Sequence, residues 1–159
     1  MTLRPLPGFT EEESLTWLTL VRATMWVPAF LDHRLRATSG INHFDYALVA
    51  TLRDQPGQAM PLTDLAEVTG GELSRLSHGI KRLSERGWVQ RRADPNDARV
   101  TLAMLTPAGH AAVINATAEY VAIVRELMLD QTTTEEREEL RVLLTPIIAR
   151  ANPRLRSRR

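Results

Sequence analysis

The stretch that decides the fold is residues 83–109, LSERGWVQRRADPNDARVTLAMLTPAG. It predicts two short strands, at residues 88–92 and 100–104, because both runs contain valine beside other residues that favour β-structure. Between them lies Asp94-Pro95-Asn96-Asp97, where the proline favours the corner of a turn. We therefore expect a β-hairpin.

The residues before this hairpin predict a pair of helices. A short helix over residues 64–68 has Thr63 as its N-cap and ends at Gly70-Gly71. A longer helix follows over residues 72–86, with Gly87 just past its end. Two helices of these lengths, joined by a short turn with glycine, are typical of a helix-turn-helix, and a hairpin placed directly after the second helix is a wing.

The second helix of this pair has two chemically different faces. Its apolar side chains recur at helical spacing: Leu73, Leu76, Ile80 and Leu83. The opposite face has the polar residues Ser74, Arg75, His78, Lys81, Arg82 and Glu85. Such a face suits the DNA major groove, where arginine binds guanine and serine or histidine reaches base edges or phosphates. A merely solvated helix is the alternative, but the helix pair and the wing favour DNA.

The wing adds its own positive charge. Asp97 and Arg99 are expected on the same side of an extended backbone, where the carboxylate orients a guanidinium that enters the minor groove. The alternative is a surface ion pair of little consequence. Arg91 in the first strand of the wing is a further candidate DNA-binding residue. Residues 73–99 together have seven basic and three acidic side chains, a net charge of +4 in a chain whose total is +1. One basic face on a nearly neutral protein indicates a polyanionic partner.

Further helices are expected on both sides of the winged region. Residues 11–37 should form a long helix that Pro28 kinks or interrupts, and Asn42 caps a helix over residues 42–54. Met60-Pro61-Leu62 is a candidate edge strand. Two C-terminal helices begin at Thr106-Pro107 and at the capping box Thr133–Glu136, the second bent or ended by Pro146.

These helices have more apolar surface than one small core can cover, so a second copy of the chain is the economical cover. The expected fold class is mostly α with a small β-hairpin, a winged helix-turn-helix core flanked by N- and C-terminal dimerisation helices. The expected regions are an N-terminal dimerisation helix, the DNA-binding region, C-terminal dimerisation helices and a basic flexible tail, at residues 1–40, 41–105, 106–151 and 152–159.

Composition excludes several other classes of protein. The chain has 159 residues, 43% of them hydrophobic and 25% charged, and it has no cysteine. Disulfides, thiolate zinc sites and thiol redox sensing are therefore excluded. No apolar run approaches the roughly 18 residues of a membrane span, and no export signal precedes the first helix, so we expect a cytoplasmic protein without a membrane partner.

An enzyme and a metal site are both poorly supported. Ser74 and His78 stand four residues apart and could mimic a nucleophile and its base, but the sequence shows neither an orienting acid nor an oxyanion hole. A metal site joining His33, His43 and Asp45 competes with the commoner case of capped or surface histidines. We predict no enzyme activity, no cofactor and no metal.

The quoted stretch and the helix before it resemble one known family. Residues 65–66, 73–78 and 83–91 look like the DNA-reading part of the multiple-antibiotic-resistance regulator (MarR) family. Residues 94–99 and 105–109 are similar to the wing of that family and its exit into the fifth helix. The similarity covers roughly residues 10–150 and is most specific over residues 83–109. Gly70-Gly71 departs from the pattern, since relatives often have a small polar residue there.

The resemblance implies a homodimeric transcriptional regulator, a repressor that binds a pseudo-palindromic operator in double-stranded DNA. It implies that the first, fifth and sixth helices interlock between two copies. Carried over by position, Ser74, Arg75, His78 and Arg82 would face the major groove, and Asp97 with Arg99 would form the tip of the wing. The alternative function is a winged-helix interaction module that binds RNA or an acidic protein partner.

The resemblance also implies release from DNA by a small, often aromatic or phenolic, ligand. Aromatic residues with polar neighbours gather on the first two expected helices, and the candidate ligand-binding residues are Trp17, Trp26, Phe30, His33, His43 and Tyr46. Arg22 or Arg53 would be the counter-ion of an aromatic carboxylate. The alternative is that these aromatic side chains pack in the core and the dimer interface.

Overall fold

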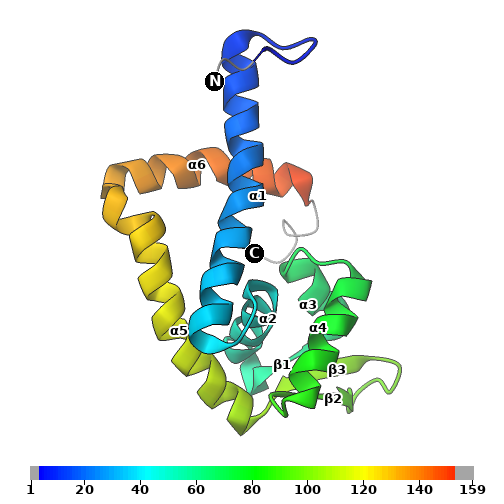
Figure 1. Ribbon diagram of the computed structural model, residues 1–159. Helices are drawn as coiled ribbons and strands as arrows, with labels where there is room; N and C mark the ends of the chain where they lie inside the picture. Colours follow the sequence, from blue (N-terminus) through cyan, green and yellow to red (C-terminus); the bar gives the residue numbers. More distant parts are fainter. Residues whose placement is uncertain (1–3, 153–159) are drawn as a thin grey trace.

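The computed structural model describes residues 4–152. Its helices and strands are α1 (Glu11–Ser39), α2 (His43–Arg53), η1 (Pro56–Gln58), β1 (Ala59–Pro61), α3 (Leu62–Val68), α4 (Leu73–Glu85), β2 (Val89–Ala93), β3 (Thr101–Leu105), α5 (Pro107–Leu127), η2 (Leu129–Gln131) and α6 (Thr134–Ala151). Six α-helices and one small sheet confirm the predicted fold class (Figure 1). Except for residue 152, the predicted basic tail lies outside the described residues.

The sheet has three antiparallel strands in the order β1-β3-β2. Val89 pairs with Leu105 and Ala93 with Thr101, so β2 and β3 form the predicted hairpin, displaced by one residue from the predicted bounds. β1 pairs with the other side of β3 and places Pro61 on an edge strand, where a residue without an N–H is tolerated. The wing is therefore attached to the helical core through β1.

The hydrophobic core surrounds α2. Its side chains Phe44, Leu48 and Leu52, four residues apart, are all buried, as their helical spacing predicts. Asn42 caps this helix, accepting a hydrogen bond of 2.7 Å from the backbone N–H of Asp45. Buried side chains from every other α-helix except α6 join this cluster, among them Leu35, Leu65, Ile80 and Ile123. α2 is thus the element against which the helix pair and the sheet are positioned.

The predicted interruption of α1 is wrong, because the helix continues through Pro28 to Ser39. Proline removes one backbone donor from the helix, but Pro28 is exposed, so water can satisfy the carbonyl that loses its partner. α6 likewise continues past the exposed Pro146 to Ala151. The predicted caps of α5 and α6, Thr106 and Thr133, are both present.

The predicted cap of α3 is also wrong. The helix begins at Leu62, directly after Pro61, and has no side-chain cap. Thr63 therefore lies inside the first turn, where its hydroxyl lies 3.4 Å from the Asp64 carboxylate. The predicted end of α3 is confirmed: Gly70 has the left-handed φ of 63° that glycine tolerates without strain.

α1, α5 and α6 form the part of the molecule opposite the sheet. Figure 1 shows α5 leading away from the wing, with α6 crossing behind α1. Arg34 of α1 donates two hydrogen bonds, of 3.1 and 2.9 Å, to the Glu126 carboxylate of α5. Large apolar side chains remain exposed on these three helices, including Leu15, Trp17, Met25, Trp26, Ile114, Val121, Leu143 and Ile148. Among the described helices, none is both long and apolar enough to cross a membrane.

Candidate nucleic-acid interface

One face of α4 anchors the helix on the core. Leu76, Ile80 and Leu83 are fully buried, as predicted. Gly79 lies where α4 meets α2, and a Cβ at this position would stand 2.8 Å from the Leu48 side chain. Leu73 was predicted on the same face but is 59% exposed. It is the first residue of α4 and lines a hollow beside the end of α6.

The residues of α4 that point away from the core are Ser74, His78 and Lys81, all exposed. Lys81 lies 3.9 Å from Glu85, one turn further along this outward face. None of the three is buried beneath another element. They are exposed side chains of α4 that can enter a groove of DNA.

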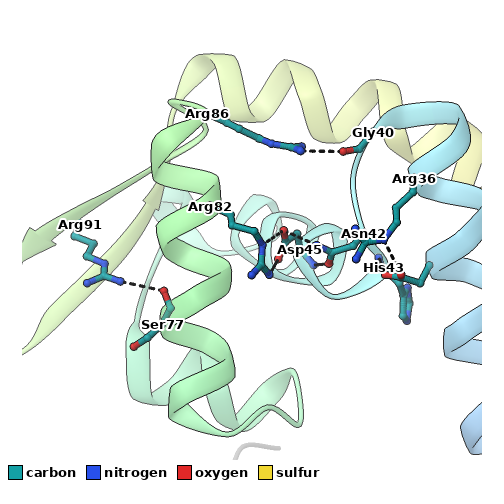
Figure 2. Close-up of polar contacts among 10 residues, drawn as sticks. Arg36, Gly40, Asn42, His43, Asp45, Ser77, Arg82, Arg86 and Arg91 are labelled. Atoms are coloured by element: carbon teal, nitrogen blue, oxygen red, sulfur yellow. Dashed lines mark hydrogen bonds and ion pairs between the residues drawn. The ribbon is translucent and has the colours of Figure 1, made fainter.

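The arginines of α4 lie at the edge of this face, on the side of α2. The guanidinium of Arg75 stands 4.2 Å from the centre of the Phe44 ring. Arg82 donates two hydrogen bonds to the Asp45 carboxylate, and Arg86 donates one of 3.0 Å to the Gly40 carbonyl (Figure 2). We call Arg75, Arg82 and Arg86 the arginine edge. The polar face predicted as one surface is therefore two: an outward stripe, and an edge held by α2 and by the end of α1.

The wing lies alongside α4. Arg91 of β2 reaches the backbone carbonyl of Ser77 at 3.4 Å (Figure 2). A hollow of about 750 Å³ separates the two elements and is lined by Ser77, His78, Lys81, Ser84, Glu85, Val89, Gln90 and Arg91. The structure thus brings Arg91 beside His78 and Lys81, two of the predicted DNA-binding residues.

At the far end of the wing, Asp97 and Arg99 form the predicted ion pair. The Nε and Nη2 atoms of Arg99 lie 3.0 and 3.1 Å from the two Asp97 oxygens, and its backbone N–H donates to the same carboxylate. These bonds lower the pKa of Asp97 and raise the pKa of Arg99. Both residues lie in the loop between β2 and β3, not on an extended strand as predicted. The Arg99 side chain is nonetheless 91% exposed.

The residues predicted to bind a ligand do not share one pocket. Trp17 is exposed on the N-terminal half of α1. Trp26 and His33 line an apolar hollow of about 470 Å³ with Phe30 and Leu127. His43 and Tyr46 instead lie on α2, where both rings stack on Tyr120 of α5, at centroid distances of 6.0 and 4.4 Å.

Neither predicted counter-ion, Arg22 or Arg53, lies beside a pocket formed by the predicted aromatic residues. Arg53 lies at the end of α2 and bonds to Asp54 and to the Thr117 hydroxyl, which also contacts Tyr46. Arg22 is exposed on α1, away from the rings of α2.

His43 faces a different cleft, of about 660 Å³, between α1, α2 and α4. The cleft is lined by Pro28, Ala29, Asp32, Arg36, Gly40, Asn42, His43, Phe44, Asp45, Arg75, Arg82 and Arg86. Burial lowers the pKa of the His43 imidazole, and Arg75 lowers it further, against the opposing effect of Asp32. Its Nδ1 atom is buried without a hydrogen-bond partner. The two acids of the cleft, Asp32 and Asp45, are already paired with Arg36 and Arg82.

The residues that sequence reasoning missed are those on α2. Phe44 and Asp45 hold Arg75 and Arg82, yet they lie about thirty residues or more before them in the chain. Their only signal is a charged residue at a buried helix position, which is rare without a partner. Within residues 4–152, no three histidine or carboxylate side chains form a metal-binding group, and Asp45 is committed to Arg82.

A helix packed by one face, an outward polar stripe and a basic hairpin beside it define a winged helix-turn-helix DNA-binding protein. Comparisons with known proteins agree with this class. Residues 41–101 match the model of the MarR family. A 78-residue segment is 27% identical to the transcriptional repressor MprA of Escherichia coli K12. The segment covers 49% of this chain and 44% of the length of that repressor.

Two solved structures from Streptomyces coelicolor cover most of the chain. Sco3205, a MarR family transcriptional regulator solved in complex with DNA, is 29% identical with a TM-score of 0.85, over 92% of each chain. AbsC, another MarR family regulator, is 29% identical with a TM-score of 0.84, over 92% of this chain and 98% of its own. Over most of its length the chain is therefore similar to MarR family transcriptional regulators.

Proposed function

We propose that this chain is a homodimeric repressor that acts in the cytoplasm and binds a pseudo-palindromic operator. The observation that supports this most strongly is the placement of the wing against α4, with Arg91 at the Ser77 carbonyl. The outward stripe Ser74, His78 and Lys81 enters the major groove and reads base edges. The basic wing then follows the DNA backbone, and Arg99 reaches the adjacent minor groove.

The arginine edge takes a different part in this proposal. Arg75 and Arg82 lie beside the outward stripe and not at its centre, because α2 holds both. A side chain at the border of a recognition helix is placed to contact the phosphates that flank the groove. These contacts strengthen binding to every sequence and do not select one.

The proposed dimer follows from the apolar surface of α1, α5 and α6. Trp26 and Leu143 are 71% and 65% exposed in the single chain, and neither belongs to the core around α2. Apolar surface of this extent is stable in water when a second copy covers it. Two-fold symmetry then places the two α4 helices about 34 Å apart, one turn of DNA.

The test is selection of duplexes from a random pool, followed by titration of the best sequence by fluorescence anisotropy. We expect an inverted repeat, affinity that falls with salt, and a loss of about 1–3 kcal/mol per half-site for Arg99→Ala. Arg125→Ala on α5, which removes an exposed arginine far from the wing, is the matched control. No preference among duplexes would contradict the proposal and favour the RNA or acidic-protein alternative.

We further propose that an aromatic carboxylate or phenolic acid releases the operator by entering the cleft beside His43. Arg75 and Arg86 supply positive charge there, and among the described residues neither makes an ion pair. The apolar hollow beside Trp26 has no such charge. Titration calorimetry with hydroxybenzoates should give binding that Arg86→Ala weakens and Trp26→Ala does not. Equal loss in both variants would contradict this placement.

A further inference from the structure

A carboxylate on α2 is buried against the recognition helix. Asp45 is 3% exposed, and its two oxygens accept three hydrogen bonds. Arg82 donates from Nε to Oδ2 at 3.0 Å and from Nη2 to Oδ1 at 2.7 Å, and Asn42 donates from Nδ2 to Oδ2 at 2.7 Å (Figure 2). A buried charge is tolerated only when it is paired and hydrogen-bonded in this way.

Both ends of this contact are fixed by their own helices. Asn42 is the N-cap of α2, and its side-chain oxygen accepts the backbone N–H of Asp45 at 2.7 Å. Across the interface, Gly79 leaves the space that the carboxylate fills, since a Cβ there would stand 3.2 Å from Asp45 Oδ1. The position of Arg82 is thus set by the start of α2 and by the absence of a side chain at residue 79.

The contact leaves one end of Arg82 available. Its side chain is 47% exposed, and Nη1 makes no hydrogen bond to any described residue. Arg99 is held in the same manner, since Asp97 also binds Nε and Nη2. The carboxylates that hold these two arginines differ in burial: Asp45 is buried, whereas the Asp97 side chain is 40% exposed. Because each arginine donates two hydrogen bonds to one carboxylate, its side chain is already restricted to few rotamers in the protein without DNA.

We propose that Asp45 is a positioning residue for DNA binding: it holds Arg82 at the edge of α4 with Nη1 directed to a phosphate beside the major groove. The inference rests on the proposed function and assigns Arg82 to the DNA backbone and Asp45 to its orientation. Asp45 itself does not touch DNA. Operator and non-operator duplexes therefore depend equally on the pair.

The test is a double-mutant cycle of Asp45→Asn and Arg82→Ala, measured by anisotropy against the selected operator and a scrambled duplex. We expect each single variant to weaken binding to both duplexes by roughly fivefold or more, with their affinity ratio unchanged. Arg82→Ala should lower the slope of log Kd against log salt by about 0.9 per protomer. The double variant should bind no more weakly than Arg82→Ala alone.

Two further variants separate positioning from folding. Arg82→Lys keeps the charge at an exposed position but cannot span both carboxylate oxygens, so we expect it to match Asp45→Asn in affinity with little loss of salt slope. Asp54→Asn removes the acid of another arginine pair, at the opposite end of α2, and should leave DNA binding unchanged. Thermal melts of every variant establish that it is folded at the temperature of the titration.

The outcomes that overturn the inference differ from those that overturn the proposed function. Additive losses in the cycle, or full affinity in Arg82→Lys, would show that Asp45 does not act through Arg82. A changed ratio between operator and scrambled duplex would assign Arg82 to a base. Absence of duplex preference in the unmodified protein, or unchanged binding in Arg99→Ala, would count against the proposed function instead.

Discussion

Gly109 of α5 lies directly against the backbone carbonyl of Trp88, so close that a Cβ on Gly109 would stand 2.1 Å from that oxygen. Thr106 fixes the same junction, because its backbone N–H donates to the Trp88 carbonyl at 2.9 Å and its hydroxyl donates to the Gly87 carbonyl at 2.7 Å. The start of the wing and the start of α5 are therefore joined without an intervening side chain.

Gly109→Ala should destabilise the fold and displace the wing. The added methyl group meets backbone that cannot move aside, and overpacking of this kind costs about 1–3 kcal/mol. Urea denaturation followed by circular dichroism measures the loss. Ala108→Ser, at the preceding exposed position, is the control and should change the free energy of unfolding by less than about 0.5 kcal/mol. Equal stability of the two variants would show that the junction is loose.

Asp97→Asn should weaken operator binding less than Arg99→Ala, by up to about fivefold, because the exposed ion pair orients the arginine and does not supply its charge. The hydrogen bonds from Arg99 hold the pKa of Asp97 below its usual range. The pair is therefore intact above the ordinary carboxyl pKa and is lost only as pH falls through the lower folded value. Anisotropy between pH 5 and 8 should show no titration of Asp97. Asp130→Asn in η2, beyond the end of α5, is the control and should behave as the unmodified protein.

His43 should make the fold less stable in mild acid. Burial lowers the pKa of the folded imidazole, so in the unfolded chain the ring binds a proton at higher pH, near about 6.5. The folded state is consequently favoured above that pH and loses stability as pH falls toward the lower folded value. Denaturation at pH 7.5 and 5.5 should show a smaller difference in His43→Gln than in the unmodified protein. His33→Gln, at an exposed position of α1, controls for the loss of a histidine.

Leu143→Glu should convert the proposed dimer to monomers. A carboxylate placed within an apolar interface loses its hydration without gaining a partner, which costs several kcal/mol. Light scattering coupled to gel filtration measures the mass, and Asn96→Glu on the exposed wing loop is the control for added charge. A Leu143→Glu protein that remains dimeric at micromolar concentration would place the interface elsewhere.

Elements bounded by local signals were predictable. The hairpin follows from Pro95 between two strand-forming runs, and the starts of α2, α5 and α6 follow from Asn42, Thr106 and Thr133, whose side chains cap the next turn. Two predictions from local signals, the interruption of α1 and the burial of Leu73, were wrong. Pro28 does not end α1, and Leu73 is exposed although it continues the apolar spacing of α4.

The order of elements and the basic character of residues 73–99 were determined by sequence alone, because caps, turns and helical periodicity act over a few residues. The division of the α4 polar face was decided only by tertiary structure. Phe44 and Asp45 draw Arg75 and Arg82 toward α2, and nothing within α4 indicates that contact. The partner of a buried carboxylate is the cation that folding brings close to it, and the spacing of residues along one helix carries no information about a contact with another helix.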